Sequence, residues 1–360
     1  MKILTGKDIH REEWSRLVKT SATGTWFQTP EAYDFFAAQP ELFEVFAVGV
    51  AKSESRVKSK ESRELRGVCV GYVTKEKGII RQFFTRRAII IGGPALADDA
   101  TSKEVELLME GVKELTSERL NGAPIYIETR NFNDYSKWKN AFEYCVDHPR
   151  RKPLLPYGRK DAPGFAYQPH LNFHVDCTDQ EAMAARLSEN RKRQIKKGER
   201  IEEAEATEQD VREWYGILQK LYQTKVKTPL FPLSFFLEFY RQKLGKFLLV
   251  RHEGHVIGGV MCAILEGRCV YEWFECGENS IYKEQYPSVM ATWAGMMWAH
   301  EQGCPRYDMM GAGEPGVPYG VRDFKSEFGG ETVEHGRFLY IAKPLLYRIG
   351  VWGVRQLKRK

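Results

Sequence analysis

The residues with the clearest chemical potential lie in the stretch 306–330, RYDMMGAGEPGVPYGVRDFKSEFGG. A strand is expected to end at Met310, and glycines and prolines then form a loop that leads to Phe324 and Lys325. A lysine that such a loop holds next to a strand-end carboxylate, here Asp308, could stabilise negative charge on a reacting oxygen. The alternative is that the charged residues of the loop only face solvent: Arg322, Asp323, Lys325 and Glu327.

A second concentration of charge lies in the stretch 188–200, SENRKRQIKKGER. It is expected to be a helix that carries five cations within seven positions: Arg191, Lys192, Arg193, Lys196 and Lys197. A row of cations like this can bind the phosphates of a nucleotide sugar or the acceptor end of a tRNA. A solvated helix face is the alternative.

The elements that must position these residues occur in the same order twice. The first set comprises strands at 44–50, 66–75 and 87–92, a helix from about 102 to 120, and a strand at 125–129. The second set comprises strands at 246–252, 255–266 and 269–276, a helix from 287 to about 302, and a strand at 306–310. We interpret this repetition as the internal duplication of an α/β unit.

Each set resembles the layout of an acetyltransferase (GNAT) unit, in which hairpin strands, a helix and a short strand follow one another. The predicted fold class is therefore α/β (or α+β), with two tandem GNAT-like domains and mixed sheets. One irregular α+β domain is the alternative. We expect domains at 1–177 and 178–342, followed by a basic amphipathic tail at 343–360.

The composition is that of a globular protein with a sizeable core. Of the 360 residues, 42% are hydrophobic and 28% are charged, and the net charge of +6 is too small for a protein that coats nucleic acid. The seven cysteines form no C-x-x-C pair, and no zinc spacing occurs, so we expect no metal site. The first residues, MKILTGKDIHREEW, lack the apolar run of a signal peptide. A cytoplasmic location is the expectation.

The stretch 306–330 resembles the corresponding part of the Fem family of nonribosomal peptidoglycan aminoacyltransferases. Fem-type enzymes carry a Tyr-Asp-x-x-Gly strand end that is followed, at about this distance, by a Phe-Lys-x-x-Phe block. The matching residues in this chain are Tyr307, Asp308, Gly311, Phe324, Lys325 and Phe328. The resemblance covers most of the chain and is strongest from about 246 to 340.

The resemblance implies catalytic roles for Lys325, Phe324 and Asp308. Lys325 would stabilise charge around the transferred acyl ester, and Phe324 would position it. Negative charge builds on oxygen when an amine attacks an ester carbonyl, and loss of one group that stabilises this charge costs about 100- to 1000-fold in rate. Asp308 would orient Lys325 or the attacking amine.

The resemblance also predicts a set of substrate-binding residues. Its members are Tyr271, Tyr282, Tyr286, Tyr307, Arg191, Arg193, Lys196, Lys225 and Lys227. Tyr271, Tyr282 and Tyr286 match an aromatic strand and a tyrosine-rich loop of the family, and Tyr307 belongs to the Tyr-Asp strand end. The cations match a basic helix and a site for the diphosphate of the cell-wall precursor. For Tyr282 and Tyr286, a position in the core or at the rim is equally open.

The start of the helix near 287 bears on the identity of the acyl donor. A CoA-dependent acetyltransferase binds pyrophosphate on the backbone N–H groups of a glycine-rich loop at this helix start. Gly277 is the one glycine in the stretch 275–288, and Pro287 has no N–H to donate. This pattern argues against ordinary acetyl-CoA binding in the second unit.

The C-terminal stretch 343–360, KPLLYRIGVWGVRQLKRK, is both basic and amphipathic. Leu345, Leu346, Ile349 and Trp352 are expected on one helix face, and Arg348, Arg355 and Lys358 lie off it. Such a helix could rest on an anionic inner membrane. Packing against the rest of the protein is the alternative.

Together these patterns predict an N-acyltransferase that moves an aminoacyl or acyl group onto a primary amine, with a cell-wall precursor peptide as the suggested acceptor. Aminoacyl-tRNA or acyl-CoA would serve as the donor substrate, with no separate cofactor. One alternative is a GNAT N-acetyltransferase that depends on acyl-CoA. Another is a non-catalytic duplicate that binds nucleotide sugar or RNA.

Overall fold

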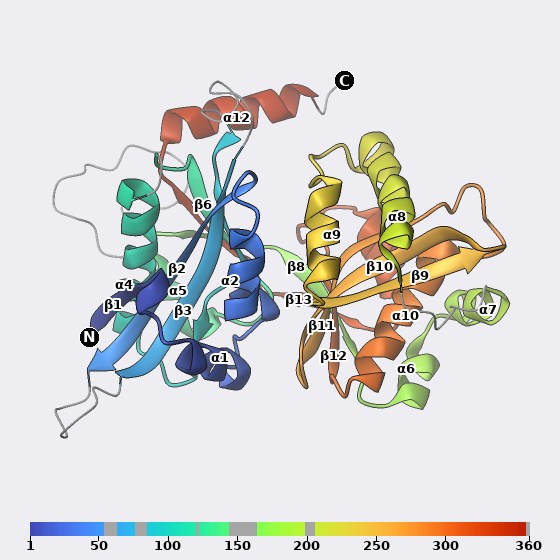
Figure 1. Ribbon diagram of the computed structural model, residues 1–360, viewed down its shortest axis with the longest axis horizontal. Helices are drawn as coiled ribbons and strands as arrows, with labels where there is room; N and C mark the ends of the chain where they lie inside the picture. Colours follow the sequence, from blue (N-terminus) through green and yellow to red (C-terminus); the bar gives the residue numbers. More distant parts are fainter. Residues whose placement is uncertain (54–62, 76–84, 120–121, 144–163, 199–205, 358–360) are drawn as a thin grey trace. The chain divides into compact units, whose positions relative to one another are not determined.

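The computed structural model describes residues 1–53, 63–75, 85–119, 122–143, 164–198 and 206–357. The chain forms two units, one of Met1–Pro169 with His335–Lys360 and one of His170–Glu334. Each unit contains a mixed sheet with helices on both faces (Figure 1). Each sheet also has its own apolar core, as expected of separate domains.

The sheet of the first unit has the strand order β1-β2-β3-β4-β6-β14-β7, and β5 pairs with β3. Its strands are β1 (Lys2–Thr5), β2 (Phe43–Ser53), β3 (Arg63–Thr74), β4 (Ala88–Gly92), β5 (Ala95–Leu96), β6 (Tyr126–Asn131), β7 (Ala166–Gln168) and β14 (Arg337–Ile341). Its α-helices are α1 (Arg11–Thr20), α2 (Pro30–Ala37), α4 (Ser102–Glu114), α5 (Lys139–Glu143) and α12 (Pro344–Leu357). Shorter helical turns are η1 (Gly6–Asp8), η2 (Trp26–Gln28), η3 (Leu115–Arg119) and η4 (Ser136–Trp138).

The sheet of the second unit has the strand order β13-β8-β12-β11-β10-β9. Its strands are β8 (Leu171–Asp176), β9 (Gly245–His252), β10 (His255–Leu265), β11 (Cys269–Gly277), β12 (Arg306–Gly311) and β13 (Glu331–Glu334). Its helices are α6 (Gln180–Arg186), α7 (Glu189–Lys197), α8 (Glu208–Leu221), η5 (Tyr222–Val226), α9 (Leu233–Arg241), α10 (Pro287–Glu301) and α11 (Gly320–Ser326). Helices α8 and α9 cover one face of the sheet, and α10 covers the other (Figure 1).

The helices that pack on these sheets begin and end where local chemistry requires it. A capping box between Thr101 and Glu104 starts α4, and one between Thr207 and Asp210 starts α8. Helix α10 is apolar around most of its circumference, because it lies between the sheet and α7. It ends shortly before Gly303, which adopts a φ of 66°.

The two sheets repeat one strand order, which confirms the predicted tandem fold of GNAT-like units. In the first unit the order runs β2-β3-β4-β6-β14-β7, and in the second it runs β9-β10-β11-β12-β8-β13. Helix α4 precedes β6, as α10 precedes β12. In both units an antiparallel set of strands leads to one parallel pair, β4 with β6 and β11 with β12.

The chain divides at different points from the boundaries expected after residues 177 and 342. Strand β8, expected in the first unit, pairs with β12 and β13 of the second sheet. The stretch 332–341, expected in the second unit, is divided at Gly336, where φ is 65°, and its second part, β14, pairs with β6 and β7 of the first sheet. Each unit thus contains one strand that the expected boundaries assigned to the other unit. Local sequence patterns do not encode this exchange.

We predict that Gly295→Ala destabilises the protein although alanine is the better helix former. A Cβ atom at Gly295 of α10 would lie 2.2 Å from the hydroxyl oxygen of Tyr307 on β12, so helix and sheet would have to separate. The free energy of unfolding, measured with urea, should fall by about 1–3 kcal/mol. The matched control is Gly216→Ala on the exposed side of α8, where nothing lies within 4 Å of the new Cβ. It should be neutral or stabilise by up to about 1 kcal/mol, and an equal effect at both positions would contradict this account.

Candidate functional site

The parallel strands β11 and β12 pair only over their first residues and then diverge. Their register joins Cys269 to Arg306, Val270 to Tyr307 and Tyr271 to Asp308. Beyond these pairs β11 continues along β10 as far as Gly277, while the register of β12 with β8 shifts after Asp308. We call this region the strand divergence. In the first unit, by contrast, β4 and β6 stay paired from 88 to 92.

Lys325 reaches into the strand divergence from α11. Its side chain is 7% exposed, and its ammonium group donates hydrogen bonds to the carbonyl of Met309 and, at 2.9 Å, to that of Gly311. Both carbonyls belong to the part of β12 that no longer pairs with β11. Burial lowers the pKa of Lys325, although nearby carboxylates act in the opposite direction. The predicted cation is therefore held in a fixed, buried place, and its catalytic role stays a prediction.

Two glutamates on β11 complete this buried cluster, and sequence reasoning missed both. Burial raises the pKa of Glu272, whose carboxylate accepts a hydrogen bond of 2.9 Å from the hydroxyl of Tyr307. Burial, together with the charge of Glu272, raises the pKa of Glu275 to about 8. The Oε1 atom of Glu275 is shut off from solvent and has no hydrogen-bond partner. The available signal was two acids within the otherwise apolar strand CVYEWFEC.

Asp308 is fully buried at the point where the strands diverge. Its Oδ1 atom accepts the N–H of Met310 at 2.7 Å. Its Oδ2 atom lies 3.2 Å from Nε2 of His174, the residue of β8 that pairs with Asp308 in the sheet. Burial alone would raise the pKa of Asp308, but His174, Arg306 and the N–H of Met310 together outweigh it, and the pKa is lowered. Met310 has a φ of 60°, which is unfavourable for a side chain of this size. The Asp308 carboxylate therefore holds a strained turn beside Lys325.

The basic helix α7 positions α11 through Arg191. The guanidinium carbon of Arg191 lies 4.5 Å from the ring centre of Phe324 and 5.1 Å from that of Phe328, and its Nε atom lies 3.5 Å from Glu327. Only 6% of Arg191 is exposed. We expected this arginine to bind phosphate, but its charge is instead buried against two aromatic rings. Arg191 and Phe324 therefore act together to place the helix that carries Lys325.

The remaining predicted residues fall into three groups by burial. Tyr271 and Tyr307 are fully buried, so the expectation that they touch substrate is replaced by a place in the core. Tyr282 and Tyr286 are half-buried, and the ring of Tyr282 lies 5.6 Å from that of His252. The predicted cations that face solvent are Arg193, Lys196, Lys225 and Lys227. Of the predicted residues, the structure thus brings Lys325, Asp308, Tyr307 and Tyr271 together around the strand divergence, whereas Phe324 packs against Arg191 and Phe328.

The starts of helices α10 and α4 are occupied by groups of the protein itself. The Oδ1 atom of Asn279 accepts the N–H of Ser288 at 3.2 Å, next to Pro287, which has no N–H. In the first unit, Glu104 and Thr101 cap the start of α4. A pyrophosphate needs unoccupied N–H groups and a positive potential at such a site. Neither helix start offers this arrangement.

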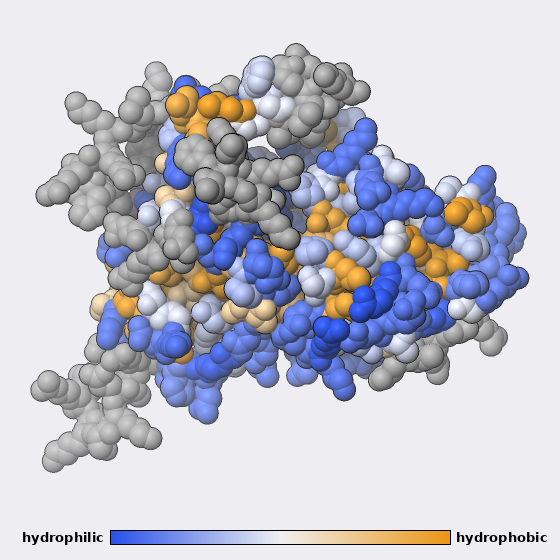
Figure 2. All heavy atoms as spheres, turned by 45° about the horizontal axis from the view of Figure 1, so that its top comes forward, coloured by the Kyte–Doolittle hydropathy of each residue, from blue (hydrophilic) through white to orange (hydrophobic). Residues whose placement is uncertain are grey.

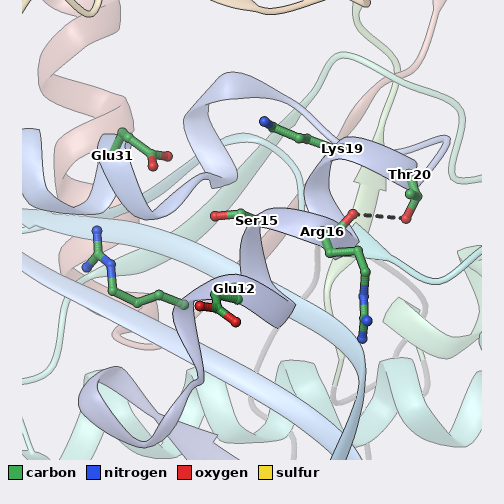
Figure 3. Close-up of a pocket in the computed structure, with 7 residues that line it drawn as sticks. Glu12, Ser15, Arg16, Lys19, Thr20 and Glu31 are labelled. Carbon is green, nitrogen blue, oxygen red and sulfur yellow. Dashed lines mark hydrogen bonds between the residues drawn. The ribbon is translucent and has the colours of Figure 1, made fainter.

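Two hollows mark the described surface. One lies over α1 and is lined by Arg11, Glu12, Ser15, Arg16, Lys19, Thr20 and Glu31, where the Thr20 hydroxyl donates to the carbonyl of Arg16 (Figure 3). It is shallow and contains none of the predicted site residues. The other, in the second unit, is bordered by His174, Asp176, Arg186, Arg306 and Glu331. The partner of Asp308 therefore lies at a surface hollow. Within the described residues, no cluster of His, Cys, Asp and Glu is arranged to hold a metal ion.

The two units share one strand order, and two parallel strands diverge in the second unit. These features define a tandem acetyltransferase-like fold. Residues 181–326 match the family model of the acetyltransferase (GNAT) domain. FemX has the same fold, with a TM-score of 0.66 and 13% sequence identity over 97% of this chain and 99% of FemX. A conserved protein of unknown function from Bacteroides thetaiotaomicron matches with a TM-score of 0.51 and 10% identity over 92% of this chain and 97% of its own. No curated protein matches the sequence.

The chain therefore has a Fem-like tandem GNAT fold, and the predicted resemblance is confirmed at the level of the fold. The domain match and the fold support an acyltransferase. The low identity to FemX carries no information on the acyl donor or the acceptor.

We predict that Glu275→Gln changes the pH dependence of stability. The folded protein raises the pKa of Glu275 from 4.5 to about 8, so between these values the folded state keeps a proton that the unfolded state has lost. This difference makes wild-type stability fall as the pH rises through that window. Because glutamine cannot ionise, the variant should gain stability relative to wild type between about pH 5 and about pH 8. The gain should be at least about 1.4 kcal/mol, which corresponds to one pKa unit.

Urea denaturation at several pH values measures this effect. The matched control is Glu284→Gln, at an exposed position of the loop before α10. A relative stability of Glu275→Gln that is independent of pH would show that Glu275 is ionised in the folded protein as it is in the unfolded chain.

Proposed function

We propose that this protein is an N-acyltransferase that moves an aminoacyl or acyl group from an ester donor onto a primary amine. The observation that carries the proposal is the ammonium group of Lys325, held in the strand divergence by the carbonyls of Met309 and Gly311. An ammonium group has three donors, and the two carbonyls use two of them. The third is available to a carbonyl oxygen that gains negative charge during attack.

The burial of Lys325 makes this stabilisation effective. A charge in a water-poor site interacts more strongly with a developing oxyanion than the same charge in solvent does. The two strand carbonyls fix the ammonium before the substrate arrives, so little reorganisation is needed when the oxyanion forms. Phe324 and Arg191 contribute indirectly, because their contact holds α11 in place.

The reaction also requires movement of a proton. The amine nitrogen forms a bond to the carbonyl carbon, the ester C–O bond breaks, and the proton that the amine loses ends on the leaving oxygen. We infer that Glu275, rather than Asp308, is the group that exchanges this proton. Asp308 is fully buried and occupied by Met310 and His174, whereas Glu275 is half-buried and interacts electrostatically with Lys325. Its pKa of about 8 is suited to exchange near neutral pH.

The occupied helix starts favour an aminoacyl ester, as carried by tRNA, over acyl-CoA as the donor. Asn279 and Pro287 leave little N–H capacity at the start of α10, and Glu104 places a carboxylate at the start of α4. The suggested acceptor is the amine of a cell-wall precursor peptide, in keeping with the Fem-like fold. A cytoplasmic location belongs to the same proposal.

Two other functions remain as alternatives. A GNAT N-acetyltransferase would bind acyl-CoA in spite of the occupied helix starts. A non-catalytic protein that binds nucleotide sugar or RNA would bind its ligand without acyl transfer from any donor.

We predict that Lys325→Met reduces acyl transfer by about 100- to 1000-fold, because it removes the cation but keeps the length of the side chain. Lys325→Ala should abolish transfer as well. The assay follows a labelled amino acid from charged tRNA to a peptide that carries a lysine amine, and circular dichroism checks the fold. Lys283→Met, at an exposed position of the loop before α10, is the matched control and should retain wild-type activity. A folded Lys325→Met protein that turns over like wild type would refute the proposed role.

We predict that acetyl-CoA binds weakly, with a dissociation constant above about 1 mM, because neither helix start can receive its pyrophosphate. Isothermal titration calorimetry with the full chain measures this directly. A heat signal that fits micromolar affinity would favour the acyl-CoA-dependent alternative over the aminoacyl ester donor.

A further inference from the structure

Helix α12 exposes a row of large apolar side chains. Leu345 is 70% exposed, Ile349 46% and Trp352 65%. Their spacings of four and three residues place them on one face of the helix. Hydrophobic residues are indeed visible at the surface where α12 lies, at the top of the molecule (Figures 1 and 2). We call Leu345, Ile349 and Trp352 the apolar row.

The apolar row is exposed although the helix itself is docked. The N–H groups of Ala342 and Lys343 both donate to the carbonyl of Ile125 at 2.9 Å, immediately before α12 begins. The ring of Tyr347, on another face of the helix, packs edge-on against Tyr126 with the ring centres 5.7 Å apart. These contacts fix the orientation of α12, so the apolar row faces outward as a consequence of packing.

The positive charges near the apolar row indicate which kind of partner binds there. The stretch 343–360 contains no Asp or Glu and six cations: Lys343, Arg348, Arg355, Lys358, Arg359 and Lys360. Arg348 is exposed and lies one turn from both Leu345 and Trp352. A helix with an apolar row and only positive charges suits an anionic lipid surface, where apolar side chains enter the interface and cations contact headgroups.

A second copy of this chain fits the same surface less well. Two copies that met through α12 in a symmetric contact would bring two identical sets of cations together. No acidic residue within 343–360 could offset the repulsion. Within the part of the chain that the structure describes, no helix is long and apolar enough to cross a membrane.

We propose that α12 is a surface anchor that lies in the headgroup region of an anionic membrane and buries the apolar row there. The inference rests on α12 and goes beyond the transfer reaction, because it does not depend on Lys325 or on the identity of the donor. It would place the enzyme at a surface where lipid-linked substrates are concentrated. One amphipathic helix gives a reversible association, so the contact should depend on salt and on lipid charge.

The test is co-sedimentation of the full chain with vesicles of phosphatidylcholine that contain about 30% phosphatidylglycerol. Binding to these vesicles should exceed binding to pure phosphatidylcholine at least about tenfold, and about 0.5 M salt should weaken it. The variant Leu345→Ser/Ile349→Ser/Trp352→Ser should lose at least about tenfold in partitioning. All three positions are exposed, so the fold should persist.

The matched control removes three other exposed apolar side chains, in Val226→Ser/Ile281→Ser/Val317→Ser. These residues are 42–59% exposed and lie in the second unit, away from α12 in the sequence. The control should bind vesicles like wild type. The proposal is overturned if the wild-type protein does not bind anionic vesicles, or if the two triple variants bind them equally. It is also overturned if sedimentation velocity shows that the wild-type protein is a dimer and that only the α12 variant is a monomer. Transfer activity of the α12 variant on a soluble acceptor should be unchanged, which separates this test from that of the proposed function.

Discussion

A buried ammonium group needs compensation for the water it has lost, and the second unit depends on how that compensation is supplied. Lys325 obtains it from the carbonyls of Met309 and Gly311 and from the nearby carboxylates of Glu272 and Asp308. An unpaired charge in this position would cost several kcal/mol. The carbonyls are available only because β12 has left the ladder with β11. Strand divergence and buried lysine therefore require each other: the first supplies the acceptors, and the second satisfies them.

The comparison of the two units shows why one layout does not give two equivalent sites. In the first unit, β4 and β6 remain paired through Gly92 and Asn131, so their carbonyls are used within the sheet. In the second unit, the left-handed backbone of Met310 turns β12 away, and the carboxylate of Asp308 holds the N–H of that residue. The strained turn is stable because the buried pair of Asp308 and His174 fixes it. A duplicated fold can thus carry asymmetric chemistry through a change at one strand end.

Sequence patterns were sufficient for the elements and for the central lysine, but not for their long-range partners. Apolar alternation, turn residues and helix caps located the strands and the helix that each unit repeats, and the resemblance to the Fem family pointed to Asp308 and Lys325. The exchange of β8 and β14 could not be predicted, because periodicity does not specify which sheet a strand joins. Arg191 was misread for the same reason: a cation in a basic run usually faces solvent, and its ring partners lie more than a hundred residues away. Glu272 and Glu275 were missed because alternation in a strand does not reveal a buried acid.

The distribution of positive charge separates two physical tasks. A cation that stabilises a reacting oxygen must be fixed and dehydrated, and Lys325 has both properties. Cations that attract a phosphate-rich donor should instead be exposed, because their effect is additive, long-ranged and sensitive to salt. Arg193 and Lys196 on α7, and Lys225 on η5, meet that requirement. A donor bound by scattered phosphate contacts needs no pyrophosphate site at a helix start. The occupied starts of α4 and α10 are therefore compatible with an RNA-linked ester, whereas an acyl-CoA would lose its main anchoring point.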